Sequence, residues 1–183
     1  MKRTFFSLAL LLAVATLTAQ TKMTAREAAV KIADRILAST TYEFKNTKTG
    51  EIYKSVKKLP LDMDVKVACK YNNWHYTNGV TNMALMELGD KLGDKKYEKY
   101  VLKNMNFVFN EGNLDFFRKQ YDEAFKRDGW NAVRKLSWHM IFRGKRLDDN
   151  GPMGASLIEL QLKYPNDSFL GYINETAEHL NYG

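Results

Sequence analysis

The feature that most constrains the fold is an internal repeat, in which two stretches of the chain match at a constant offset of 72 residues without a gap. Identical pairs in this alignment include Asn78 and Asn150, Gly79 and Gly151, Leu85 and Leu157, Glu87 and Glu159, Leu88 and Leu160, and Tyr100 and Tyr172. Amphipathic helices of equal length resemble one another through composition alone. A shared Asn-Gly pair before the first helix and a shared break between helices are harder to explain in that way. The repeat therefore predicts two copies of one helical hairpin.

Apolar residues at helical spacing extend this pattern over most of the chain and predict an all-α fold. A helix is expected over 24–38, where Thr24 and Glu27 are placed to form a capping box. Further helices are expected over 77–92, 95–110, 114–126, 131–142, 152–163 and 168–180. The segment 40–73 differs, because a Thr-Gly turn, Pro60 and only short apolar runs predict a loop with little regular structure.

Each predicted hairpin has one apolar face that it cannot bury alone, so neighbouring hairpins must stack into a solenoid or close into a ring. In a closed ring the first helices of the hairpins form one layer, and the loops at one end of that layer converge on one mouth. The repeat places Tyr76 and Asp148 at the same position, two residues before the Asn-Gly pairs. We therefore expect Tyr76 and Asp148 to line a common cleft.

The first 19 residues are expected to be a secretory signal peptide rather than part of the fold. Lys2 and Arg3 precede an apolar run from Phe5 to Leu17, and the small residue Ala19 follows, which is the pattern of a cleaved signal. This run is shorter than the about 20 residues that a membrane span needs, and no later segment is apolar enough to be one. Residues 20–183 are therefore expected to form an exported domain, periplasmic or secreted, without a membrane span.

Composition excludes several classes of protein. Cys69 is the only cysteine, so no intramolecular disulfide can form. Without Lys2 and Arg3, 26 of the 28 basic residues remain against 21 acidic residues, and the net charge near +5 suits an anionic partner without specifying one. The lysines lack interleaved aromatic residues, so we expect no nucleic-acid groove. No residue spacing suggests a metal site, and the absence of phosphate-binding and dinucleotide motifs predicts that there is no cofactor.

Asp148 and Asp149 lie directly before Asn150, Gly151 and Pro152, and they have a structural and a functional interpretation. An Asp close before a proline can accept amide hydrogens and stabilise a helix N-terminus by about 1 kcal/mol. Only one side chain is needed for the cap, and Asn150 can also serve it. At least one of the two carboxylates therefore lacks a structural task and can face a substrate.

The stretch YNNWHYTNG, residues 71–79, carries Trp74, His75 and Tyr76 in a predicted turn before a helix. A turn is an unusual place for large aromatic side chains if packing is their only purpose. Sugar rings offer apolar faces that stack on such side chains, while Tyr76, His75 and Asn78 can bond sugar hydroxyls. The alternative is that Trp74 anchors the loop onto the core.

The stretches WHYTNGVTNMALMELGDKLGDKKY and RLDDNGPMGASLIEL together resemble the unsaturated glucuronyl and rhamnogalacturonyl hydrolases of glycoside hydrolase families 88 and 105, and most closely the family 105 type. The resemblance covers most of the chain from about Ala25 onward. It implies an (α/α)6 barrel, a ring of six helical hairpins. It also implies hydration of the C4–C5 double bond of a terminal unsaturated uronic acid, after which the product rearranges and the glycosidic bond breaks. Most glycosidases use a paired-carboxylate displacement instead.

The resemblance also implies roles for individual residues. Asp148 matches an Asp that assists catalysis, and the groups of the W-x-Y-x-x-G motif at 74–79 contact the sugar. The expected substrate-binding residues are Trp74, His75, Tyr76, Asn78 and Asp149. The implied partner is an anionic oligosaccharide.

The sequence departs from the family pattern at the proton donor. In the family this donor belongs to a later motif resembling Trp-x-Asp-Asp, and none of Trp74, Trp130 and Trp138 is followed by Asp at that spacing. With about three hairpins instead of six, the chain is expected to form about half of an (α/α)6 barrel. One hypothesis is a fragment of a hydrolase for unsaturated uronic-acid oligosaccharides with little activity of its own. The other is a non-catalytic exported α-helical module that binds a glycan or a partner protein.

Overall fold

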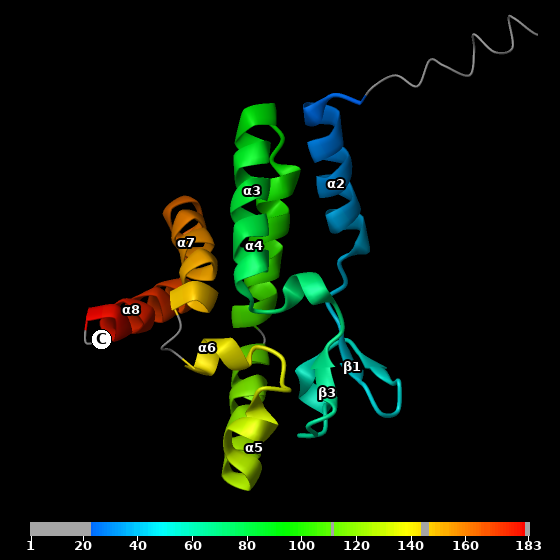
Figure 1. The fold of residues 1–183 in the computed structure, drawn as a ribbon, viewed down its shortest axis with the longest axis vertical. Helices are drawn as coiled ribbons and strands as arrows, with labels where there is room; N and C mark the ends of the chain where they lie inside the picture. The colour runs from blue at the N-terminus through cyan, green and yellow to red at the C-terminus, as the bar shows by residue number, and fades with distance from the viewer. Residues whose placement is uncertain (1–22, 111, 144–146, 182–183) are drawn as a thin grey trace, which may run out of the picture. The chain divides into compact units, whose positions relative to one another are not determined.

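The computed structural model describes residues 23–110, 112–143 and 147–181, and the signal peptide expected over 1–19 lies outside them. Helices make up most of the described chain, as an α-dominated fold requires, and a small sheet accompanies them (Figure 1). The helices are α2 (Ala25–Ser39), α3 (Tyr76–Leu92), α4 (Lys96–Phe109), α5 (Asn113–Val133), α6 (His139–Arg143), α7 (Leu147–Lys163) and α8 (Asp167–Asn181), with short 3-10 turns at Val56–Lys58 and Lys70–Asn72. In these residues no helix combines the length and the apolar character that crossing a membrane requires.

The chain divides within α2, because residues up to Ile32 form one unit and residues from Ala33 onward form another. The start of α2 has the predicted capping box. The Thr24 amide donates to a carboxylate oxygen of Glu27 at 2.8 Å, and the Glu27 amide donates to the Thr24 hydroxyl at 3.2 Å. The bonds from the backbone and the hydroxyl of Thr24 lower the pKa of the Glu27 carboxyl. The sequence motif was sufficient here, because all of its partners are local.

The prediction that residues 40–73 have little regular structure is wrong, because this segment forms a three-stranded antiparallel sheet. Its strands are β1 (Phe44–Asn46), β2 (Ile52–Tyr53) and β3 (Val65–Val67), in the order β2-β1-β3. Asn46 begins the turn after β1, where its side-chain oxygen accepts the amide hydrogens of Lys48 and Thr49. Strands of two or three residues are too short for an alternating pattern to be recognised in the sequence.

The two predicted copies of the repeat are present as helical hairpins, α3 with α4 and α7 with α8. The first helices of the two hairpins, α3 and α7, are both 17 residues long. They pack side by side (Figure 1), with Gly79 of α3 against Pro152 of α7 near their N-terminal ends and Asp90 against Lys163 near their C-terminal ends. The first helices therefore run parallel, with both N-terminal ends at the same end of the pair.

The helix pair predicted over 114–126 and 131–142 is observed in part. Asp128 and Gly129 leave the helical conformation inside α5, with φ of −148° and 52°, so the helix breaks between the two predicted ranges. Ala124 before the break packs with Val133 and Leu136 after it, so the chain turns back there as in a hairpin. Within the second predicted range the chain then forms only the short helix α6, which begins directly after Trp138. The indole of Trp138 donates to the carbonyl of Asn72 at 2.7 Å, and such a tertiary bond overrides the helical propensity of its neighbours.

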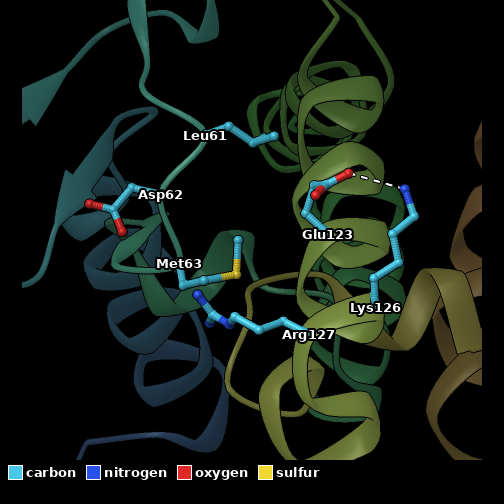
Figure 2. Close-up of a pocket in the computed structure, with 6 residues that line it drawn as sticks. All are labelled: Leu61, Asp62, Met63, Glu123, Lys126 and Arg127. Atoms are coloured by element: carbon cyan, nitrogen blue, oxygen red, sulfur yellow. Dashed lines mark hydrogen bonds and ion pairs between the residues drawn. The ribbon is translucent and has the colours of Figure 1, made fainter.

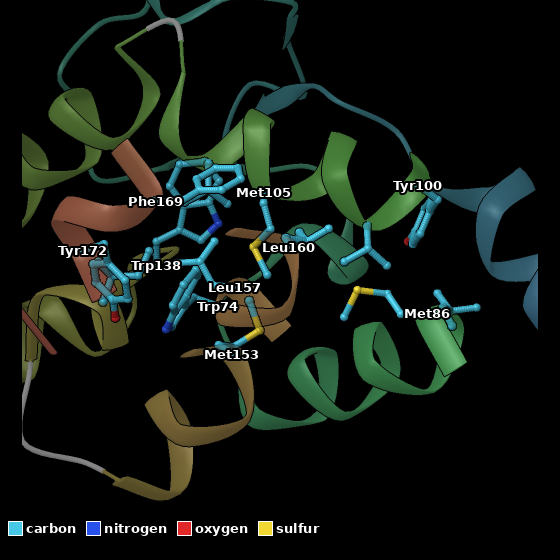
Figure 3. Close-up of a cluster of buried hydrophobic side chains, with 14 of the residues drawn as sticks. Trp74, Met86, Tyr100, Met105, Trp138, Met153, Leu157, Leu160, Phe169 and Tyr172 are labelled. Carbon is cyan, nitrogen blue, oxygen red and sulfur yellow. The ribbon is translucent and has the colours of Figure 1, made fainter. Parts of the chain in front are cut away.

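A core of large aromatic and aliphatic side chains joins the two hairpins to the sheet. Its almost fully covered members include Phe44, Trp74, Tyr97, Phe117, Trp138, Leu157, Leu160 and Phe169. Figure 3 shows Trp74 beside Met153 and Leu157 of α7. The loop directly before α3 is thus fixed by packing against the second hairpin.

Candidate functional site

The predicted site residues lie at the N-terminal ends of α3 and α7. Tyr76 is the first residue of α3, and Asp148 is the second residue of α7. The sequence predicts that this helix begins at 152 with Asp148 in the loop before it, but α7 already begins at Leu147. The prediction of a loop is therefore wrong, and the acidic pair lies in the first helical turn. The side chains of Asp148 and Asp149 lie outside the described part of the structure.

Trp74 is part of the core at this end. Its side chain is only 1% exposed, and its indole N–H donates to Oδ1 of Asn150 at 2.9 Å. The hydroxyl of Tyr172 donates to the same oxygen at 3.4 Å, and the two aromatic rings meet edge to face at 5.2 Å. Burial raises the pKa of Tyr172 to about 12. Of the two interpretations of Trp74, these contacts support the loop anchor, because neither ring face is open to a sugar.

Asn78 also has structural partners. Its amide nitrogen donates to the carbonyl of Lys70 at 2.9 Å and to the carbonyl of Asn73 at 2.7 Å. Both amide hydrogens are therefore used to hold the chain that leads into α3. A sugar hydroxyl could bond only to the remaining oxygen of this side chain.

His75 and Tyr76 leave more of their surface available. His75 caps α3, since its Nδ1 accepts the amide hydrogen of Thr77 at 3.4 Å and lies 3.0 Å from the Thr77 hydroxyl. The ring of His75 lies 4.7 Å from that of Tyr76, and Tyr76 is 47% exposed. A bond from His75 to a ligand must come from Nε2. The two rings thus form an exposed aromatic surface at the start of α3.

Trp138 contributes to this end in a way that the sequence does not reveal. Its backbone has a φ of 57°, which residues other than glycine rarely adopt, and its side chain is fully buried. Its amide N–H donates to Oδ1 of Asn73 at 3.4 Å, and its indole bonds Asn72. Such a backbone conformation costs about 1 to 2 kcal/mol, which the surrounding contacts must offset. Trp138 thereby fixes the two residues that precede Trp74.

Two of the cavities in the described part of the chain bear on the choice of this site. One of about 350 Å³ has Tyr172 in its wall and carries Asp115, Arg118 and Glu175, none of which the sequence singled out. Its size suits a sugar-sized ligand, because small-molecule sites begin at about 300 Å³. It lies next to the Trp74 anchor, since Tyr172 contacts both.

The second cavity, of about 540 Å³, lies between α5 and the loop before β3. Figure 2 shows Glu123 turned toward Lys126, at 3.1 Å, and Asp62 turned away from α5. The carboxylate of Asp62 accepts the amide hydrogen of Asp64 at 3.0 Å. Because both carboxylates of this wall already have partners, the cavity is a weaker candidate for chemistry than the ends of α3 and α7.

The parallel helices give the candidate site an electrostatic preference. Each helix N-terminus carries about half a positive charge from its unpaired amide groups, and two such ends lie together here. Asp148 and Asp149 in the first turn of α7 supply two acidic residues at this position, and an aromatic surface lies beside it. The arrangement can offer acidic residues and an aromatic face to a sugar ring.

A scan against models of protein families and a search of curated proteins found no match to this chain.

Proposed function

We propose that this chain is part of an (α/α)6-barrel glycoside hydrolase that acts on unsaturated uronic-acid oligosaccharides. The observation that carries the proposal is the parallel packing of α3 and α7, which brings His75 and Tyr76 to the same end as the Asp148 turn. A substrate at this end would meet an aromatic surface, two helix N-termini and an acidic turn. The aromatic surface can stack on the sugar ring, and the acidic turn supplies a carboxylic acid for the hydration step.

Each group then has a definite task. The ring of Tyr76 stacks on the sugar, and Nε2 of His75 bonds a hydroxyl. Asp148 assists proton transfer to the C4–C5 double bond, and a second carboxylic acid must supply the proton that Asp148 does not. In an intact enzyme with that donor, we expect Asp148→Asn to depress turnover far more than Asp149→Asn. Equal effects would mean that the acidic pair is wrongly assigned.

The repeat itself supports a larger ring. Gly79 and Asp90 contact α7, and Met86 lies between them on the same face of α3 by helical spacing. The corresponding residues of α7 at an offset of 72 are Gly151, Ile158 and Leu162.

This equivalent face of α7 is open. No atom of the described residues lies within 4 Å of a Cβ built on Gly151, and Ile158 and Leu162 are 47% and 80% exposed. An apolar stripe of this kind is expected where a further first helix packs as α7 packs on α3. The stripe therefore supports a series of hairpins that continues beyond α8.

The test measures binding and turnover separately, with an unsaturated uronyl disaccharide and its saturated counterpart as ligands. Calorimetry gives the affinity, and the ultraviolet absorbance of the double bond gives the rate of hydration. We expect the unsaturated sugar to bind more tightly and Tyr76→Ala to weaken it about tenfold, the usual effect of removing a binding aromatic ring. Phe125→Ala, which removes a similarly exposed ring on α5, should leave the affinity unchanged. The proposal would be contradicted if neither the unsaturated nor the saturated disaccharide bound detectably.

The alternative is a non-catalytic exported module that binds a glycan or a partner protein. It is favoured by the burial of Trp74 and the engaged amide of Asn78, because these residues support the loop instead of a substrate. Such a module has no reason to distinguish the two disaccharides. Equal affinities without any loss of absorbance would therefore favour the module over the hydrolase.

A further inference from the structure

We propose that the cavity between the C-terminal end of α4 and the sheet is a second binding site, specific for a single sugar acid. This site does not depend on the function proposed above. The cavity has a volume of about 280 Å³. Its walls are two lysines, three asparagines and two aromatic residues, namely Lys54, Lys103, Asn106, Asn110, Asn113, Tyr42 and Phe107.

The cavity opens on the side of α4 that faces away from Trp74. Phe107 packs against Tyr42 and Phe44 with ring centroids 5.4 and 5.2 Å apart, whereas Phe109 packs against Trp74 at 5.9 Å. Residues two positions apart on a helix point about 200° apart, so Phe107 and Phe109 lie on opposite faces. A ligand in this cavity would therefore occupy a place distinct from the ends of α3 and α7.

The positive charge of the cavity favours an anionic ligand. Lys54 and Lys103 both line it, and the described residues of its wall include no carboxylate. Neither ammonium forms an ion pair with a carboxylate in the described part of the chain. The Lys103 ammonium lies 4.1 Å from the centre of the Tyr42 ring, which holds this charge over the aromatic wall. One carboxylate of a ligand would be attracted to both lysines.

Asn113 leaves a buried acceptor to which a hydroxyl of the same ligand could donate. Asn113 is only 3% exposed, and its amide nitrogen donates to the carbonyl of Phe107 at 2.7 Å. Its Oδ1 is buried and has no hydrogen-bond partner among the described residues. A buried acceptor without a donor is unusual in a folded protein, and a ligand hydroxyl that reaches it would supply the missing bond. A carboxylate cannot do so, because it has no hydrogen to donate.

The size and walls of the cavity limit the ligand to one ring. Sites for larger ligands begin at about 300 Å³, and this cavity of about 280 Å³ is just smaller, so it has room for no more than a monosaccharide or the end of a chain. The ring of Tyr42 and the side chain of Phe107 can cover the apolar face of a pyranose, and Asn106 and Asn110 can bond its hydroxyls. A sugar acid meets all three requirements, for charge, for hydroxyl donors and for an apolar face.

The test titrates the purified chain with galacturonic acid, and uses galactose and acetate as matched probes that lack the carboxylate or the hydroxyls. Calorimetry measures affinity, and NMR follows the side-chain amides of Asn106 and Asn110. We expect galacturonic acid to bind at least ten times more tightly than either matched probe and to shift both amides. Lys54→Met and Lys103→Met should each weaken binding at least fivefold.

Lys99→Met is the control, because Lys99 is an exposed lysine one turn earlier on α4 and does not line the cavity. It should leave the affinity unchanged. Equal binding of acetate would overturn the proposal, since it would reduce the cavity to a weak anion site. Equal binding of galactose, or full affinity in the Lys103→Met chain, would also overturn it, because the lysines would then have no part in recognition.

Discussion

Replacing Gly79 by Ala tests the parallel contact between α3 and α7 directly. A Cβ at this position would lie 2.5 Å from the backbone nitrogen of Met153 and 2.7 Å from the carbonyl oxygen of Pro152. Backbone atoms of a helix cannot move aside as a flexible side chain can, so α7 must shift away from α3. Forcing extra atoms into a close-packed contact costs about 1 to 3 kcal/mol.

The repeat provides a matched control in Gly151, which aligns with Gly79 and where an added Cβ would lie more than 4 Å from every described neighbour. Ala is a better helix former than Gly by about 1 kcal/mol, and this gain applies to both positions. We therefore expect Gly151→Ala to stabilise the chain by about 0.5 to 1 kcal/mol, whereas Gly79→Ala should destabilise it by about 1 to 2 kcal/mol after the same gain is subtracted.

The assay is denaturant unfolding followed by circular dichroism, which gives the free energy of unfolding of each variant. Opposite signs for the two glycine substitutions are the expected result. Equal destabilisation would mean that the face of α7 around Gly151 is covered in the same way as the face of α3. A stabilised Gly79→Ala chain would refute the close parallel contact itself.

Two further predictions concern the contacts that hold the hairpins together. Trp74→Phe keeps most of the ring but removes the donor to Asn150, so we expect a loss of about 1 to 2 kcal/mol in the same unfolding assay and little change in sugar affinity. The second prediction concerns Glu98. The ammonium of Lys163 and the hydroxyl of Tyr164 bond its carboxylate and hold its pKa below the ordinary value of 4.5. Because the folded-state pKa is lowered, this stabilisation is complete above about pH 5 and is lost as the pH falls through the folded-state value. Thermal unfolding of Glu98→Gln should therefore depend less on pH between about 5 and 3 than that of the unchanged chain, and parallel curves would contradict this assignment.

The repeat allowed the helical hairpins to be predicted because it records a packing relation between distant segments. The observed start of α3 at Tyr76 is next to the predicted start at 77, whereas α7 begins at Leu147, more than one turn before the predicted start at 152. Gly79 of the first Asn-Gly pair lies where α3 contacts α7. The capping box at Thr24 was also predicted, since all of its partners are within three residues. The hairpins and the capping box could be predicted because their sequence patterns are either local or repeated along the chain.

The sheet and the short length of α6 depend on contacts that neither local pattern nor repeat contains. The strands are too short for periodicity, and the chain near Trp138 follows its indole bond to Asn72 and its left-handed backbone. At the candidate site, the sequence predicted which residues share one end but not which of them are exposed. Trp74 and Tyr76 are both aromatic and lie two residues apart, yet one is buried against Asn150 and the other faces outward. Only the packing of the second hairpin decides between them.

The most direct test of the central claim is an NMR titration of the chain with an unsaturated uronyl disaccharide, following the ring resonances of His75 and Tyr76. If the parallel ends of α3 and α7 form one side of a substrate cleft, both rings should shift together and saturate at one affinity. The shift of His75 should largely disappear in Tyr76→Ala. Shifts confined to Tyr42 and Lys103, with His75 and Tyr76 unchanged, would contradict the claim and place sugar binding at the other side of α4.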